Sequence, residues 1–334
     1  MTRAAVFGSG NWGTAFGMVL ADAGTEVTLW GRRADLAEAI NVNRENPDYL
    51  PGFTLPDGLS ATTDPATALK GADFALLAVP SQTLRANLPA WAALAGPHTV
   101  YVSLMKGVEL GTCMRMSEVI AECTGAGPDR IAVISGPNLA HEVVRRLPAG
   151  TVVASADQAT AERLQKACHT PYVRPYTSND VIGCELGGAV KNVIGLAAGM
   201  ADGMGLGDNA KGTLITRGLA EITRLGVAVG ADPYTFAGLA GLGDVVATCG
   251  SSLSRNHMFG VHLGRGLSVV QASELVRETA EGVKSCESVL ELAERHGVDM
   301  PIARAVVGVV HDGHSPKEML ATLMARSAKS EALY

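Results

Sequence analysis

Residues 3–30 read RAAVFGSGNWGTAFGMVLADAGTEVTLW, and this stretch decides the fold of the amino-terminal half of the chain. The apolar run at 3–7 predicts a β-strand, and the apolar run at 27–30 predicts a second one. Between them a helical pattern covers 14–23 and stops at Gly24. A strand, a glycine-rich turn, a helix and a strand within about 30 residues are the context that a dinucleotide-binding turn requires. The sequence therefore predicts a Rossmann-type α/β domain with a mostly parallel sheet.

The turn between the first strand and the helix has the spacing G-x-G-x-x-G. In this motif the first glycine makes the tight turn, and the second lets the backbone approach a pyrophosphate. The third lets the helix touch the strand, and the helix N-terminus then holds the phosphates. The tryptophan inside the turn either packs on the core or lines the cofactor cleft. The predicted cofactor positions in the turn are Gly8, Ser9, Gly10, Asn11, Trp12 and Gly13.

The end of the second strand bears on the choice of cofactor. NAD sites usually place an acidic residue there for the ribose hydroxyls, whereas an arginine accommodates the 2′-phosphate of NADP. Here Arg32 and Arg33 follow the strand, and the first acidic residue is Asp35. The sequence favours NADP(H), with NAD(H) still open. The plainer alternative is that the two arginines are solvated residues at the start of a helix. A long loop is predicted at 41–60, from which Tyr49 could reach the cleft.

The carboxyl ends of the later strands mark further candidate positions, because ligands of such sheets bind outside those ends. Lys106 follows the strand predicted at 100–103, so it is placed to meet cofactor or substrate, although a surface lysine is the plainer alternative. The turn Ser135-Gly136-Pro137-Asn138 follows the strand at 131–135. Further strands are predicted at 74–79, 151–154 and 172–174, and helices at 65–69, 83–94, 113–123 and 159–169.

The pattern changes class after about residue 180, where strands stop and helical patterns dominate. We therefore predict a dinucleotide-binding domain at 1–179 and an all-α domain at 180–334, with the boundary near Asn179. The helices predicted in the second domain cover 181–200, 212–225, 234–239, 268–274, 283–296 and 300–310.

The first of these helices carries one charge in an apolar setting. Residues 186–201 are almost wholly glycine, alanine and aliphatic, apart from Lys191 and Asn192. This pattern predicts a helix that is buried on nearly all sides, with small residues that let other elements pack close. A membrane span is not expected, because the stretch is short and its middle is polar. A buried lysine must be paired, or its pKa falls. Lys191 is therefore either a structural ion-pair partner or a proton-transfer residue, with Asn192 as a hydrogen-bonding neighbour.

The composition excludes several other classes of function. The net charge is −6, from 27 basic and 33 acidic residues, and no basic block occurs, which argues against nucleic-acid binding. The six cysteines are well separated and form no CxxC motif, so the sequence predicts neither a metal site nor a redox pair. No secretory signal opens the sequence, and a cytoplasmic location is expected.

Further motifs carry a resemblance to a known family. The run Gly238-Leu239-Ala240-Gly241-Leu242-Gly243-Asp244 is followed by Thr248-Cys249 and then by Ser254-Arg255-Asn256. Together with GSGNWG, Lys106-Gly107, ELGGAVKNV and GLGDNAK, these motifs closely resemble the bacterial NAD(P)-dependent sn-glycerol-3-phosphate dehydrogenases over essentially the whole chain. The resemblance implies a Rossmann domain followed by a helical domain and, by analogy, a homodimer. It also implies reversible reduction of dihydroxyacetone phosphate to sn-glycerol 3-phosphate for phospholipid synthesis.

The resemblance assigns roles to individual residues. It makes Lys191 the catalytic lysine. It implies substrate contacts at Lys106, Gly136, Asn138, Asp244, Ser254, Arg255 and Asn256, and cofactor contacts at Ser9, Trp12, Arg32, Arg33, Lys106, Ala140, Arg255 and Glu281. The sequence departs from the family pattern at Asn138-Leu139, where Ser-Phe is usual, and at Thr279, where an apolar residue is common.

These residue types suit the reduction of a ketone, which needs a hydride, a proton donor at the carbonyl oxygen and a cationic cradle for the phosphate. Lys191 would give the proton and take it back, Asp244 would orient Lys191, and Asn192 and Thr248 could hydrogen-bond the substrate. Ser254 would otherwise be a simple helix cap beside a solvated arginine. Two other functions stay open at this point: a dehydrogenase for a hydroxy acid or a ketopantoate-like substrate, and a non-catalytic nucleotide sensor.

Overall fold

The computed structural model describes residues 1–276 and 280–327, so Thr279 lies outside the described part of the chain. Contacts between residues divide the chain into two compact units. The first contains Met1–Met105 and Met116–Val181, and the second contains Lys106–Arg115 and Ile182–Tyr334. The segment Lys106–Arg115 thus packs with the second unit, although it directly follows a strand of the first. The domain limits of 1–179 and 180–334 remain a prediction.

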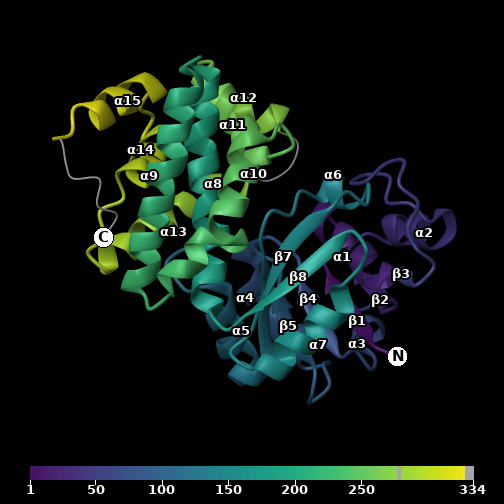
Figure 1. Ribbon diagram of the computed structural model, residues 1–334. Coiled ribbons are helices and arrows are strands. Elements are labelled where there is room, and N and C mark those ends of the chain that lie inside the picture. The colour runs from purple at the N-terminus through teal and green to yellow at the C-terminus, as the bar shows by residue number, and fades with distance from the viewer. Residues whose placement is uncertain (277–279, 328–334) are drawn as a thin grey trace. The chain divides into compact units, whose positions relative to one another are not determined.

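The first unit is built on one eight-stranded sheet with the order β3-β2-β1-β4-β5-β6-β7-β8 (Figure 1). All neighbouring strands are parallel except β6 and β7, which are antiparallel. This arrangement confirms the predicted mostly parallel, Rossmann-type sheet. The strands are β1 (Arg3–Phe7), β2 (Glu26–Trp30), β3 (Leu59–Thr62), β4 (Phe74–Leu77), β5 (Val100–Ser103), β6 (Ile131–Ser135), β7 (Ala149–Ala154) and β8 (Val173–Ser178).

Helices connect these strands and bury the apolar faces of the sheet. Helix α1 packs against α6 and α7, while α4 and α5 pack against each other. The helices are α1 (Asn11–Asp22), α2 (Ala34–Asn43), α3 (Pro65–Leu69), α4 (Leu84–Ala92), α5 (Met116–Thr124), α6 (Ala140–Val143) and α7 (Gln158–Cys168).

The long loop predicted at 41–60 is shorter in the structure. Helix α2 continues to Asn43 and strand β3 begins at Leu59. Only Leu36 and Ile40 of α2 are buried, so the apolar periodicity of this helix is weak. Strand β3 is a four-residue edge strand, and its sequence LSAT has little apolar character. The sequence therefore predicted neither element, because few of their side chains enter the core.

The second unit is mainly helical, as predicted, although its segment Lys106–Arg115 is not helical and contains an isolated β-bridge between Val108 and Arg115. The helix predicted at 234–239 corresponds to the short 3-10 helix η3 (Pro233–Ala237), whereas η4 (Leu239–Gly243, a π-helix) and the helices α10, α11 and α15 were not predicted. Its helices are α8 (Val181–Gly203), α9 (Gly207–Ala228), α10 (Asp244–Gly250), α11 (Arg255–Gly264), α12 (Val269–Leu275), α13 (Glu281–Arg295), α14 (Pro301–Val310) and α15 (Pro316–Met324).

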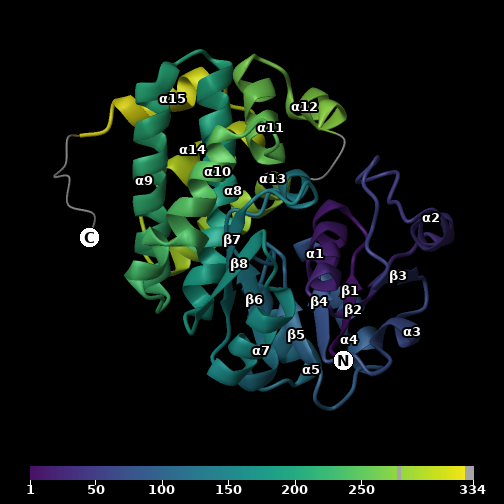
Figure 2. The ribbon, with the colours of Figure 1, turned by 45° about the vertical axis from the view of Figure 1, so that its right-hand side comes forward.

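Helix α8 runs through the middle of this unit (Figure 2), and α9, α10 and α11 all pack closely against it. Small residues allow the close approach that the sequence predicted. A Cβ atom on Gly199 would lie 2.0 Å from the carbonyl oxygen of His257 on α11, and one on Gly195 would lie 2.7 Å from the methyl group of Thr248 on α10. In the described residues, only α8 has the length and hydropathy of a membrane span, and 83% of its apolar window is buried, as in a core helix.

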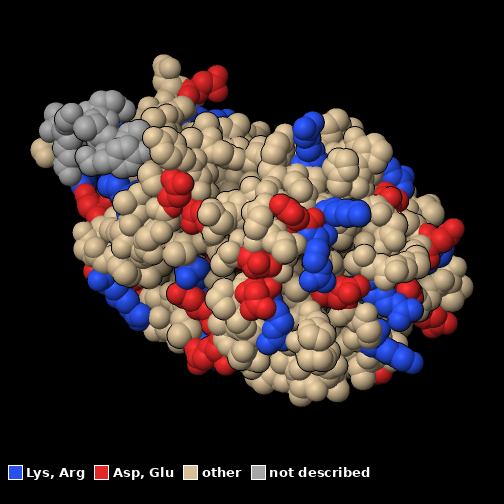
Figure 3. Space-filling model, turned by 60° about the horizontal axis from the view of Figure 1, so that its bottom comes forward, with Lys and Arg blue, Asp and Glu red and all other residues tan. Residues whose placement is uncertain are grey.

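The surface carries charges of both signs. On the face drawn in Figure 3, lysine and arginine side chains are interspersed with aspartate and glutamate side chains. That face therefore offers no extended field of one sign, of the kind that attracts a polyanion such as nucleic acid.

Candidate active site

A cluster of three charged side chains lies in the helical unit, in which Asp244 and Lys191 are buried and Lys106 is partly buried. Asp244 is the first residue of α10 and is only 1% exposed. Its Oδ2 atom accepts a hydrogen bond from Lys106 Nζ at 2.5 Å, and its Oδ1 atom lies 2.9 Å from Lys191 Nζ. One carboxylate thus holds two ammonium groups from distant parts of the chain. The structure brings together three of the predicted site residues.

Thr248 completes this cluster one helical turn after Asp244. Its Oγ1 atom accepts a hydrogen bond from Lys191 Nζ at 2.5 Å and lies 3.4 Å from Asp244 Oδ1. Gly195 stands one turn after Lys191 on α8 and meets the methyl group of Thr248, so no side chain separates the two helices there. The glycine of α8 therefore lets α10 approach closely enough for the lysine and the threonine to bond.

Lys106 in this cluster has a pKa closer to neutral than that of an ordinary lysine. Burial lowers the pKa of Lys106 to about 8; Asp244 opposes this shift, and the neighbouring Lys191 ammonium adds to it. Two positive charges share a single carboxylate, so the protonated pair is less stable than two separate ion pairs would be. Groups that lose or gain a proton near neutral pH are suited to proton transfer and to anion binding.

Of the remaining predicted substrate residues of this unit, Asn192 lies on α8 and the others lie at the start of α11. Ser254 is the N-cap of the helix and accepts a hydrogen bond from His257 N at 3.3 Å, which is the capping role that its sequence position also allowed. Arg255 is the first helical residue and is exposed, whereas Asn256 is buried and bonds Asn192. Glu281 begins α13 and is partly buried.

The glycine-rich turn of the first unit has the geometry that a dinucleotide requires. Gly8 has a φ of +119°, and a Cβ atom there would lie 2.6 Å from the carbonyl oxygen of Ala78. A Cβ atom on Gly13 would lie 1.9 Å from the Gly8 carbonyl oxygen, whereas Gly10 faces open space. Gly10 is also the N-cap of α1, and no side chain caps the helix there. Open space over an uncapped helix start fits a pyrophosphate that takes hydrogen bonds from backbone N–H groups.

Asn46 supports this turn and was not predicted. It is fully buried, and its Nδ2 atom donates to Ser9 O at 2.9 Å and to Thr14 Oγ1 at 2.8 Å. It stands in the stretch that was interpreted as a loop, where no motif signals its contact with a turn 37 residues earlier. Trp12 packs beside Phe16, with ring centroids 5.4 Å apart, so its packing role is present in the structure.

The arginines after β2 differ in their surroundings. Arg33 forms ion pairs with Asp35 and Asp48, while Arg32 is exposed. An anion that bound Arg33 would have to compete with two carboxylates. Tyr49 is partly buried against the core of the first unit, and its backbone N–H points to Asn46 Oδ1 at 3.4 Å.

The predicted residues after β6 also belong to the first unit. Gly136 has a φ of +137°, Asn138 donates to Thr151 Oγ1 at 3.2 Å, and Ala140 begins α6. They lie at the carboxyl end of β6, where ligands of such sheets bind. The two sets of predicted residues thus belong to different units.

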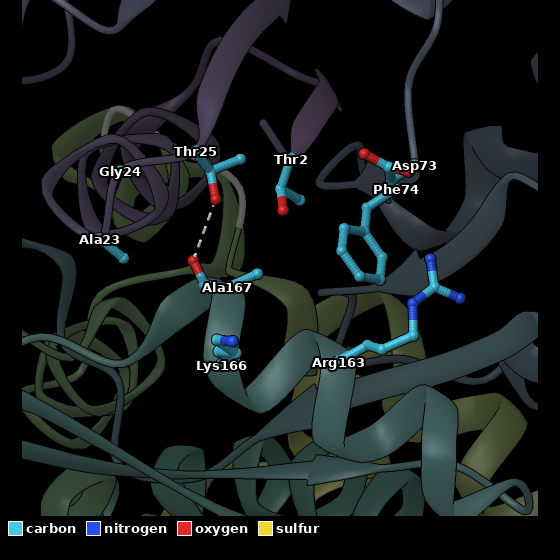
Figure 4. Close-up of a pocket in the computed structure, with 9 residues that line it drawn as sticks. All are labelled: Thr2, Ala23, Gly24, Thr25, Asp73, Phe74, Arg163, Lys166 and Ala167. Carbon is cyan, nitrogen blue, oxygen red and sulfur yellow. Dashed lines mark hydrogen bonds between the residues drawn. The ribbon is translucent and has the colours of Figure 1, made fainter.

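A pocket of about 300 Å³ lies at the amino ends of β1 and β4 (Figure 4). Arg163 and Lys166 line it together with Asp73 and Phe74, and Arg163 stacks over the Phe74 ring. It contains none of the predicted site residues and lies at the edge of the sheet where ligands of this fold do not bind. Across the described ranges, no group of three or more metal-ligating side chains is assembled.

Comparison with known proteins identifies the family. Residues 3–161 match the model of the NAD-dependent glycerol-3-phosphate dehydrogenase N-terminus, and residues 180–321 match the model of its C-terminus. The chain belongs to this family. A glycerol-3-phosphate dehydrogenase (NAD(P)+) from Streptomyces avermitilis is 68% identical over 329 residues, which cover 98% of each chain. One from Thermobifida fusca is 62% identical over 332 residues, 99% of each chain.

A solved structure agrees with this assignment. The crystal structure of glycerol-3-phosphate dehydrogenase from Coxiella burnetii shares 36% sequence identity with the chain and superposes with a TM-score of 0.93. The match covers 97% of this chain and 99% of that one. The family resemblance stated from the motifs is therefore confirmed, and it extends over both units.

Proposed function

We propose that the protein is an NAD(P)-dependent glycerol-3-phosphate dehydrogenase that interconverts dihydroxyacetone phosphate and sn-glycerol 3-phosphate. Its family supplies the reaction class, and the cluster of Asp244, Lys106 and Lys191 is the observation that supports the chemistry. A cytoplasmic, homodimeric enzyme that serves phospholipid synthesis is the setting we propose for this activity.

Lys191 is the proposed acid and base. The nicotinamide cofactor, when bound, supplies or accepts the hydride. In the reduction, Lys191 Nζ gives a proton to the carbonyl oxygen, and in the oxidation it takes one from the hydroxyl group. Thr248 and Asp244 hold this ammonium group by the hydrogen bond and the ion pair described above. Lys106 adds a second positive charge beside the same carboxylate, which favours an anionic substrate.

The substrate phosphate is proposed to bind at the start of α11. The first N–H groups of a helix have no partner within it, and they attract anions. Arg255 stands in this first turn, and its planar guanidinium group can meet two phosphate oxygens. Ser254 holds the turn in place as its cap. We propose further substrate contacts at Gly136 and Asn138 in the first unit.

One substitution tests this phosphate site. Arg255→Lys should lower kcat/KM for dihydroxyacetone phosphate at least tenfold, or about 1.4 kcal/mol, because one point charge replaces a two-pronged contact. Unphosphorylated dihydroxyacetone should be a poor substrate for both enzymes, and the substitution should affect it much less. Equal losses for the two ketones would remove Arg255 from the phosphate site. Since Arg255 is also a proposed cofactor contact, the affinity for NADPH is measured in the same variant.

The proposed cofactor is NADP(H), with NAD(H) as a second possibility. It binds at the glycine-rich turn, and Ala140, Glu281, Lys106 and Tyr49 are proposed as additional contacts. Arg32 and Arg33 would hold the 2′-phosphate, which requires Arg33 to exchange a carboxylate for it. Replacing both with alanine should raise KM for NADPH by the equivalent of about 2–4 kcal/mol and leave KM for NADH nearly unchanged. Equal weakening of both cofactors would show that the arginines do not read the 2′-phosphate.

The activity itself is tested with purified protein, NADPH and dihydroxyacetone phosphate by following the absorbance of the reduced nicotinamide. Oxidation of NADPH that requires the phosphorylated ketone is the expected result. Oxidation with a ketopantoate-like acid in its place would favour the other dehydrogenase. Binding of NADPH without turnover of any ketone would favour a nucleotide sensor.

A further inference from the structure

Four segments of the helical unit meet at a chain of side-chain amides. Asn192 donates from Nδ2 to the backbone carbonyl oxygen of Lys106 at 3.1 Å. Asn256, on α11, donates from Nδ2 to Asn192 Oδ1 at 2.9 Å. The backbone N–H of Gly282, on α13, donates to Asn256 Oδ1 at 2.9 Å. We call these three hydrogen bonds, which join Lys106, α8, α11 and α13, the amide ladder.

Both ends of the amide ladder fix its orientation. The Lys106 carbonyl can only accept a hydrogen bond, and the Gly282 N–H can only donate one. Turning either amide over would therefore bring two acceptors or two donors together. The two asparagines are 3% and 8% exposed, so water cannot easily replace a lost partner. Leaving a buried polar group without a partner is costly, and each link consequently depends on the next.

The start of α13 fits closely on this ladder. A Cβ atom on Gly282 would lie 2.8 Å from the backbone carbonyl oxygen of Asn192 and 2.9 Å from Asn256 Oδ1. A glycine at this position therefore lets the first turn of α13 approach α8 and α11. Glu281, the proposed cofactor contact, directly precedes it. The ladder thus sets where Glu281 stands relative to α8 and its lysine.

We propose that Asn192 and Asn256 are positioning residues that tie the phosphate-binding turn of α11 to the cofactor-binding start of α13. This inference rests on the proposed function, which assigns those two ends. The side-chain amide of Asn256 is committed to Asn192 and Gly282. Asn256 therefore reaches the substrate through its backbone N–H in the first turn of α11, and breaking the ladder weakens cofactor binding as well as substrate binding.

Cofactor affinity in the absence of substrate tests the inference. For Asn256→Ala, Kd for NADPH, measured by nicotinamide fluorescence, should rise about fivefold or more, the scale of one lost buried hydrogen bond. KM for dihydroxyacetone phosphate should rise in the same variant. A side chain that only contacted the substrate phosphate would leave Kd for NADPH unchanged, and that result would overturn the proposal.

A double-mutant cycle provides a second test. Asn192→Ala should raise Kd for NADPH in the same way. The double variant should have the same Kd as the single variant that binds NADPH more weakly, because one broken link already interrupts the ladder. If the factors by which the two substitutions raise Kd multiply in the double variant, the two asparagines act independently, and the proposal is overturned.

Gly282→Ala tests the inference even if the asparagine variants do not fold. It removes neither asparagine side chain, but its Cβ atom displaces the start of α13. It should raise Kd for NADPH, and an unchanged Kd in a variant that still unfolds cooperatively would contradict the proposal. Asn209→Ala, on the exposed part of α9, is the control that should change neither quantity. If the wild type binds NADPH but does not reduce dihydroxyacetone phosphate, the proposed function fails, and the Kd comparisons still test the ladder.

Discussion

Removing the carboxylate between the two lysines is the perturbation with the largest expected effect. Asp244→Asn keeps the size of the side chain but leaves two ammonium groups, formerly 2.5 and 2.9 Å from carboxylate oxygens, without a negative partner. Removing one partner of a buried ion pair costs about 3–5 kcal/mol. Part of that cost is relieved when a lysine gives up its proton. Burial has already lowered the pKa of Lys106 to about 8, and Asp244 is the group that opposes this shift.

The expected outcome for Asp244→Asn is therefore twofold. The free energy of unfolding, measured with urea at pH 6, should fall by about 3 kcal/mol, and the loss should shrink at pH 9, where a neutral lysine needs no partner. The kcat for reduction of dihydroxyacetone phosphate should fall about 10²–10⁴-fold, since the carboxylate no longer holds Lys191 in place. Asp202→Asn is the matched control, because Asp202 pairs with Lys211 in the same unit at 2.8 Å but is one-quarter exposed. An Asp244→Asn enzyme with nearly normal turnover would refute the reasoning.

Three further predictions concern packing and pH. Gly199→Ala should destabilise the protein by about 3 kcal/mol, because its Cβ would lie 2.0 Å from the His257 carbonyl oxygen; Gly212→Ala, which meets nothing within 4 Å, should stabilise it slightly. Burial raises the pKa of Glu221 from 4.5 to about 7. The stability that its protonated carboxyl group contributes is therefore fully present below pH 4.5 and is lost as the pH rises through 7. The melting temperature of the wild type should consequently decline over that range, and a Glu221→Gln variant with the same slope would exclude this carboxyl group as the cause. Finally, kcat/KM for the phosphorylated ketone should fall as the pH rises through about 8, where Lys106 loses its charge, and Lys106→Arg should move this fall to higher pH; identical profiles would assign it to another group.

Short-range patterns explain how much of the fold could be predicted. The glycine spacing at residues 8–13 has its meaning within one turn, and the isolated charge of Lys191 within one helix. Both motifs have the local geometry that their sequences indicate. Helices α10 and α11 were missed because they are short and glycine-rich turns flank them, which hides their periodicity.

The site depends on contacts that local patterns cannot show. Lys106 and Asp244 are 138 positions apart, and Asn46 and Ser9 are 37 apart, so no periodicity relates them. Family resemblance assigned roles to Lys106 and Asp244 one by one, but it did not show that one carboxylate holds both lysines. The amide ladder was hidden for the same reason, because its links join residues 86, 64 and 26 positions apart.

The turnover of a Lys191→Met variant tests the central claim most directly. Methionine keeps much of the length and packing of lysine but cannot hold a proton. The kcat for NADPH-dependent reduction of dihydroxyacetone phosphate should fall about 10²–10⁴-fold, the scale of a positioned proton transfer, while Kd for NADPH stays close to that of the wild type. Turnover near the wild-type value in a variant that binds NADPH normally would contradict the assignment of Lys191 as the acid and base.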